Sequence, residues 1–164
     1  MRDEYRELWG DIPIVLCSEE NYLGPQETYT KKQAIATADR TPLTQLADPY
    51  NMVLLYSNLY LDENIQLICH IVPEIKKFIF IGDARQINQT NNLDIRNKLK
   101  KTHPNVEYQF ITPQDMTTNQ LLDSLYFVDP KTTGVLFSSW FYKTTFAGNT
   151  SLVSNAHKLI GTTA

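Results

Sequence analysis

The sequence predicts an α/β protein of three layers (α/β/α), with a doubly wound, mostly parallel, Rossmann-like sheet covered by helices on both faces. Short apolar runs alternate along the chain with segments whose apolar residues recur at helical spacing. Most of the runs are continuously apolar, which is typical of parallel strands buried on both faces. The 164 residues are 42% hydrophobic and 20% charged, so the chain can bury a core and is too apolar for disorder.

The first predicted strand is the apolar run IPIVLC at residues 12–17. A polar stretch with three prolines follows over residues 19–50, and only residues 31–39 show weak helical periodicity, enough for a turn. A compact domain rarely holds so long a loop, so we place a segment boundary there. The expected segments are residues 1–50 and 51–164.

Strands continue in a regular order after residue 50. The run at 106–111 alternates in polarity, which suits a position nearer the edge of the sheet. The strands predicted in this part are residues 52–56, 77–82, 106–111 and 134–138.

Helices are predicted between and after these strands. Asp62 can cap the first of them, and Pro73 ends it because proline disfavours a helical residue before it. The others are residues 93–101, a helix that begins at a Thr117/Gln120 capping box, and residues 151–160.

Charge and cysteine content exclude several classes of function. Lysine and arginine number 15 against 18 aspartates and glutamates, a net charge of −3, so no broad basic surface favours nucleic acid as a partner. Cys17 and Cys69 form no metal-binding motif, and we expect buried thiols rather than a bridge. Residues 1–11 are too charged for a signal peptide, and no apolar run approaches the length of a membrane span.

Ligands of open α/β sheets bind beyond the carboxyl ends of the strands, so candidate binding residues are expected at those positions. Asp83 could accept hydrogen bonds from a polar ligand, and the two aromatic side chains there offer large apolar area. The competing interpretation is ordinary loop chemistry, with packing of the aromatic residues under the loop 140–149. The candidate ligand-binding residues are Ser18, Asp83, Ser139, Trp140 and Phe141.

Signatures of catalysis are missing from the sequence. It contains no GxGxxG or GxxxxGK[ST] phosphate loop, no GxSxG elbow and no metal-ligand spacing of histidines, so we expect no cofactor, no metal and no enzymatic activity. A phosphate-accepting receiver domain is a weaker alternative. Glu19-Glu20, Asp83, Ser139 and Lys143 supply its residue types, but Lys143 follows Ser139 too closely to come from the next strand.

The order of apolar blocks resembles a known family. ENIQLICHIVPEIKKFIFIGDA (63–84) is similar to the passage that opens the second lobe of type I periplasmic-binding-protein-like domains. LDIRNKLKKTHPNVEYQFI (93–111) and TTNQLLDSLYFVDPKTTGVLFSSWFYKT (117–144) resemble the helices and strands that follow. IPIVLCSEENY (12–22) resembles the last strand of the first lobe, and residues 23–50 the passage across the hinge.

The resemblance is greatest to the extracytoplasmic sensor region of bacterial hybrid two-component histidine kinases. It implies that residues 1–50 are the last strand of a preceding lobe plus a crossover, and that residues 51–164 form a sensor lobe. It also implies a periplasmic location in an inner-membrane protein. The implied partners are a small-molecule or protein signal and the rest of the sensor, and a homodimer stays open.

Two other classes compete with a sensor. A solute-binding protein of an ABC transporter would share the fold but diffuse freely as a two-lobe protein. A small α/β enzyme would need a convergent set of catalytic groups, which the sequence does not show.

Overall fold

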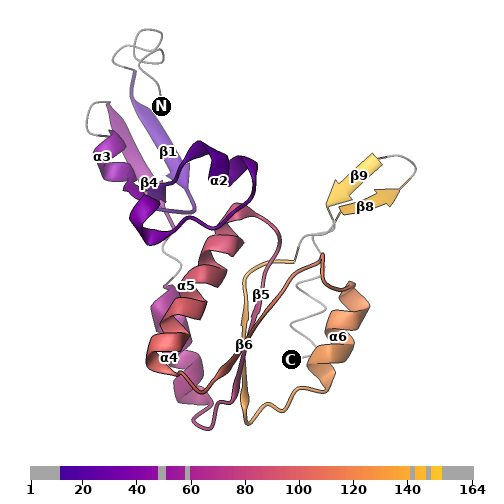
Figure 1. Cartoon of the computed structure of the whole chain (residues 1–164). Coiled ribbons are helices and arrows are strands. Elements are labelled where there is room, and N and C mark those ends of the chain that lie inside the picture. Colours follow the sequence, from indigo (N-terminus) through magenta and orange to yellow (C-terminus); the bar gives the residue numbers. More distant parts are fainter. Residues whose placement is uncertain (1–11, 48–50, 58–59, 141–142, 147–148, 153–164) are drawn as a thin grey trace. The chain divides into compact units, whose positions relative to one another are not determined.

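The computed structural model describes residues 12–47, 51–57, 60–140, 143–146 and 149–152, and within them the protein is mixed α/β with mostly parallel sheets and no closed barrel (Figure 1). The chain divides into two compact units, Met1–Tyr60 and Leu61–Ala164. No helix in the described part of the chain is long and apolar enough to cross a bilayer.

The first unit is built from two small sheets and short helical segments. A parallel pair joins β1 (Ile14–Ser18) to β4 (Met52–Tyr56), with Ile14 opposite Met52 and Ser18 opposite Tyr56. The polar stretch between them is not the plain loop that its composition predicts, although a turn does form within residues 31–39. Its elements are β2 (Tyr22–Leu23), α2 (Gln26–Thr30), the 3₁₀ turn Thr37–Asp39, β3 (Thr41–Pro42) and α3 (Leu43–Ala47), and β2 pairs antiparallel with β3.

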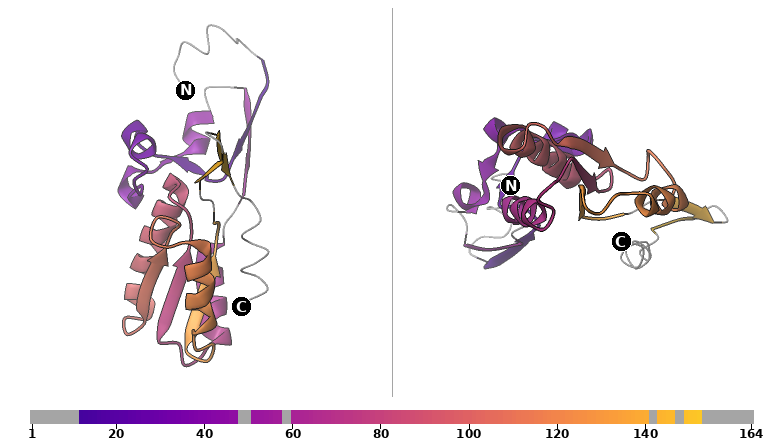
Figure 2. Two further views of the ribbon diagram at one scale, coloured as in Figure 1. Left: turned by 90° about the vertical axis from the view of Figure 1, so that its right-hand side faces the viewer. Right: turned by 90° about the horizontal axis from the view of Figure 1, so that it is seen from below.

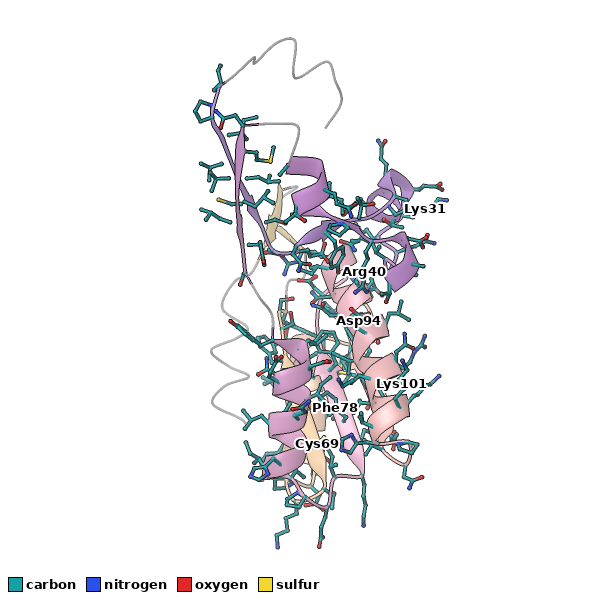
Figure 3. All side chains as sticks on the ribbon, turned by 90° about the vertical axis from the view of Figure 1, so that its left-hand side faces the viewer. Lys31, Arg40, Cys69, Phe78, Asp94 and Lys101 are labelled. Carbon is teal, nitrogen blue, oxygen red and sulfur yellow. The ribbon has the colours of Figure 1, made fainter. Side chains whose placement is uncertain are left out.

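Side-chain contacts hold these short elements together. Ile35 is fully buried and packs over Gly24, where even a Cβ atom would come within 2.5 Å of the isoleucine. Arg40, labelled in Figure 3, lies over the ring of Tyr22 at 4.7 Å and donates a hydrogen bond to the carbonyl of Ile35. Elements of two to five residues bury too little apolar surface to be stable alone, so such contacts are needed.

The second unit contains a three-stranded parallel sheet in the order β6-β5-β7. The prediction that residues 77–82 and 134–138 form parallel neighbours is confirmed, since Lys77 pairs with Thr133 and Ile81 with Phe137. The edge position predicted for residues 106–111 is confirmed too. The elements in chain order are α4 (Leu61–Ile71), β5 (Lys77–Ile81), α5 (Gln86–Thr102), β6 (Glu107–Ile111), α6 (Thr118–Tyr126) and β7 (Thr133–Phe137).

Helices cover both faces of this sheet. Phe78 and Phe80 of β5 pack with Ile65 of α4 and with α5, whereas Ile79 and Ile81 pack with α6 on the opposite face. The strand thus alternates its side chains between two apolar layers, as a central parallel strand must. Figure 1 shows α4 and α5 on one side of the sheet and α6 on the other, and the views of Figure 2 agree.

The chain changes direction across the sheet between β5 and β7. From β5 it passes through α5 to β6 on one side, and then returns through α6 to β7 on the other side of β5. Right-handed crossovers in opposite directions place their helices on opposite faces, which explains the positions of α5 and α6. Such a reversal leaves the carboxyl ends of two neighbouring strands without a covering connection between them.

Several expectations are corrected by the structure. The strand at residues 52–56 pairs with β1 and does not join the sheet of the second unit, so the described strands do not form one sheet. The helix predicted from residue 93 begins at Gln86. Cys17 and Cys69 are free, but neither is buried as expected, since Cys17 is exposed and Cys69 is half-buried.

The end of the described chain also differs from the prediction. Residues 151 and 152 are not helical, because β9 (Asn149–Leu152) pairs antiparallel with β8 (Lys143–Phe146). β8 and β9 are rich in threonine and serine, and threonine favours strands over helices. Residues 153–160 of the predicted helix lie outside the described residues.

Candidate functional site

The carboxyl ends of β5 and β7 meet at one edge of the sheet. The peptide N–H of Gly82 donates to the carbonyl of Ile111 at 3.1 Å, and that of Ser138 donates to Ile81 at 2.9 Å, so strand pairing continues to the very end of β5. Asp83 is the second residue after β5, and Ser139 is the second residue after β7. Because these strands are parallel and in register, the two side chains are brought together.

A buried carboxylate occupies this edge. Asp83 is only 2% exposed, and its two oxygens accept hydrogen bonds from three residues. The backbone N–H of Arg85 donates at 2.8 Å, the Arg85 Nε at 2.9 Å, the Asn88 amide at 2.9 Å and the Ser139 hydroxyl at 2.8 Å. A buried carboxylate needs this many partners. If it lost its bound water and gained no hydrogen bonds in return, the folded state would be destabilised by on the order of several kcal/mol.

Asn88, in the first turn of α5, connects the members of this cluster. Its amide nitrogen donates to Asp83 Oδ1 and to Ser139 Oγ, and its amide oxygen accepts from Ser138 Oγ, each at 2.9 Å. Both amide hydrogens are therefore used. Gly82 makes room for the side chain, since a Cβ atom there would lie 3.1 Å from Asn88 Cγ. We call Asp83, Arg85, Asn88, Ser138 and Ser139 the edge network.

The charge of Asp83 is stabilised within the edge network. Burial alone would raise the pKa of its carboxyl, but the Arg85 N–H, the Ser139 hydroxyl, the Asn88 amide and the Arg85 guanidinium together hold that pKa below its ordinary value. The carboxylate is consequently ionised at neutral pH. It can accept hydrogen bonds and orient donors, but it has no proton to give as a general acid.

The edge network has a buried part and a surface part. Asp83, Asn88 and Ser139 are buried, whereas the side chain of Arg85 is 48% exposed and Ser138 is exposed. Chemically the arrangement suits recognition of a polar group at the surface, backed by rigid buried partners. A contact at Arg85 or Ser138 would be transmitted to β5, α5 and β7, because the hydrogen bonds join these three elements.

The predicted site residues have different fates. Asp83 and Ser139 are hydrogen-bonded to each other. Trp140 is only 3% exposed, packs among Ile79, Leu121 and their neighbours, and donates its indole N–H to Thr118 Oγ1 at 3.0 Å. That placement matches the packing interpretation rather than an exposed binding wall, because its ring belongs to the core beside α6.

Two further candidates do not join this cluster. Ser18 belongs to the first unit, where its hydroxyl accepts the N–H of Glu20 at 3.1 Å. Phe141 lies outside the described residues. Sequence reasoning missed Asn88, because it began the helix at residue 93, and it did not select Arg85 or Ser138, although both lie at the carboxyl ends of predicted strands. The available signal was the run of polar residues directly after Gly82.

The receiver alternative gains no support from this geometry. Its acidic pair Glu19-Glu20 lies in the first unit, and the oxygens of Asp83 are already occupied by donors from its own unit. Within the part of the chain that the structure describes, no three acidic, histidine or cysteine side chains gather closely enough to hold a metal ion.

Comparison with known proteins gives no relative. No family model, no curated protein and no solved structure matches this chain significantly.

Proposed function

We propose that this chain is part of the extracytoplasmic sensor region of a bacterial two-component histidine kinase, with a signal-transducing rather than a catalytic role. The lobe of the periplasmic-binding-protein type that was predicted for residues 51–164 would be the second unit, residues 61–164, because residues 52–56 pair with β1. It would be doubly wound and located in the periplasm as part of an inner-membrane protein. A small molecule or a protein signal would act at the edge network, and the rest of the sensor would carry the response to the kinase.

The observation that carries this proposal is the edge network at the reversal between β5 and β7. Open α/β sheets bind ligands at such a reversal, and here it holds an ionised buried carboxylate with a complete set of donors. The network joins β5, α5 and β7, so a signal that acts on it would move these three elements together. A ligand shifts such a unit between two arrangements only when it binds one of them better than the other.

An enzyme is less well supported by the same geometry. The side chains that meet at the edge are a carboxylate, a guanidinium, an amide and two hydroxyls, and the described residues add no imidazole or thiol to them. The Ser138 hydroxyl donates to the amide oxygen of Asn88, which is no base, and the Ser139 hydroxyl donates to Asp83, whose lowered pKa makes its carboxylate a weak base for activating a serine.

A transporter solute-binding protein remains the second candidate, because it would use the same lobe and the same edge. The coding sequence around this chain separates the two candidates. A sensor gene continues into a membrane-spanning helix and kinase modules, whereas a transporter gene encodes a secreted two-lobe protein. Membranes that contain the intact protein should also incorporate phosphate from ATP on a histidine. Absence of kinase modules and of this phosphorylation would contradict the proposal.

A further inference from the structure

The amino-terminal edge of the same sheet has a different chemistry. Because β5, β6 and β7 are parallel, the loops that lead into them meet at this edge: residues 72–76, 103–106 and 127–132. Hydrogen bonds tie the loops together, since Lys76 N–H donates to the carbonyl of Thr132 at 2.7 Å and Glu107 N–H donates to that of Lys76 at 2.8 Å. The edge is therefore one continuous, fixed surface.

Two aromatic side chains stand out from this edge. Tyr126 is 74% exposed and Phe127 is 84% exposed, the latter the highest value among the exposed large apolar residues of the described chain. Their rings contact each other edge to face, with centroids 5.3 Å apart, so each ring limits the freedom of the other. They end α6 and open the loop into β7. Exposing these rings is unfavourable for the folded chain, because their apolar surface stays in contact with water.

Lysines outnumber acidic residues at this edge. Five lysines lie in the loops or within one helical turn of them, against four acidic residues. The lysines are Lys76, Lys77, Lys100, Lys101 and Lys131, and the acids are Glu74, Glu107, Asp123 and Asp129. Lys77 and Glu107 pair at 3.4 Å and cancel each other's charge, which leaves four lysines against three acidic residues. The edge is thus positive on a chain whose net charge is −3.

We propose that this edge docks on the surface of an anionic lipid bilayer, with Tyr126 and Phe127 entering the headgroup region and the lysines facing the lipid phosphates. Exposed aromatic rings beside lysines are typical of surfaces that bind at the membrane interface. A protein partner fits less well, because lysine is depleted in protein–protein interfaces. The proposal does not need a ligand at the edge network, and it would direct that opposite edge away from the membrane.

Sedimentation of the full chain with vesicles tests the proposal. The chain should bind vesicles of mixed phosphatidylglycerol and phosphatidylcholine, bind phosphatidylcholine alone weakly, and be released as salt rises, because salt screens the lysines. The double substitution Lys76→Gln with Lys131→Gln should weaken binding to anionic vesicles on the order of 20-fold, since each lysine near an anionic surface contributes about fivefold. Tyr126→Ser with Phe127→Ser should weaken it about tenfold or more.

Matched variants show whether the effect belongs to this edge. Lys31→Gln with Lys32→Gln makes the same change in charge in the first unit, and Leu67→Ser removes an apolar side chain that is 54% exposed on α4. Both should bind like the parent chain, and circular dichroism should show that all variants are folded. Equal binding to neutral vesicles, no binding to anionic vesicles, or equal losses in the matched variants would overturn the proposal. Self-association abolished by the Tyr126/Phe127 change, with no vesicle binding, would assign the edge to a protein contact instead.

Discussion

Replacing Asn88 with aspartate places a second carboxylate in the edge network with almost no change of shape. The amide nitrogen lies 2.9 Å from Asp83 Oδ1, and two carboxylates at that distance repel by about 6 kcal/mol at an effective dielectric constant of 20. The folded protein can avoid this repulsion by binding one proton at the pair. At pH 7 that costs about 4 kcal/mol for a carboxyl of ordinary pKa. We therefore expect the free energy of unfolding of Asn88→Asp to fall by about 4 kcal/mol.

The stability of Asn88→Asp should depend on pH in the opposite direction from that of the parent. The folded variant holds a proton that its unfolded chain lacks between pH 7 and about pH 4, so its stability should rise on acidification, by about 1.4 kcal/mol per pH unit. The parent should behave in the opposite way. The pKa of Asp83 is lowered by folding, so the stability it contributes is present above its ordinary pKa of 3.8 and is lost as the pH falls below that value.

Urea unfolding at several pH values measures both effects, followed by the fluorescence of Trp140 in the core of the same unit. Asn97→Asp is the matched control, because Asn97 is exposed on the same helix, and it should cost no more than about 0.5 kcal/mol. A stability of Asn88→Asp within about 1 kcal/mol of the parent at pH 7, or no gain on acidification, would refute a closed network around Asp83.

Three further predictions concern the second unit. Gly134→Ala places a methyl group against Ile68 and should lower the free energy of unfolding by about 1–3 kcal/mol, measured by thermal unfolding. An unchanged melting temperature would contradict the close packing of α4 on β7. Thr117→Ala removes the acceptor for the Gln120 N–H at the start of α6 and should cost about 1 kcal/mol in urea, whereas Thr117→Ser should restore it. Burial raises the pKa of Tyr108 above its ordinary value of 10, so the stability that the neutral phenol contributes is complete below pH 10 and is lost as the pH rises further. Tyr108→Phe should therefore reduce the loss of stability above pH 10. An unchanged dependence of stability on pH in that range would contradict the burial of the Tyr108 hydroxyl.

The regular elements of the second unit were predictable because their local signals agree with their packing. Residues 77–82 form a continuous apolar run and become the central strand, and the Thr117/Gln120 capping box forms as the sequence indicates. The start of α5 could not be predicted in the same way. Residues 88–92 are rich in asparagine, which is a poor helix former, and the turn is stabilised by the hydrogen bonds that join Asn88 to Ser138 and Ser139, about fifty residues later in the sequence.

The pairing of strands was harder to predict than their existence. Residues 52–56 form the expected strand but pair with β1, more than thirty residues earlier in the sequence. An apolar run predicts a strand, but it shows neither which neighbour the strand will pair with nor how deeply it will be buried, since Val53 and Leu55 of β4 are more than half exposed. Because the carboxyl ends of parallel strands lie at one edge of a sheet, the sequence correctly predicted that Asp83 and Ser139 lie together. It could not show that the Trp140 ring turns into the core, since that direction depends on the packing of α6.

The most direct test of the proposed function is autophosphorylation of the intact membrane protein with changes at the surface part of the edge network. Arg85→Ala and Ser138→Ala alter the exposed members of the network, while Arg96→Ala changes an exposed arginine further along α5 and serves as the control. Labelled phosphate incorporated from ATP should change in the first two variants and match the parent in the third, at equal protein levels and melting temperatures. Three variants that all behave like the parent would show that the signal does not act at this edge of the sheet.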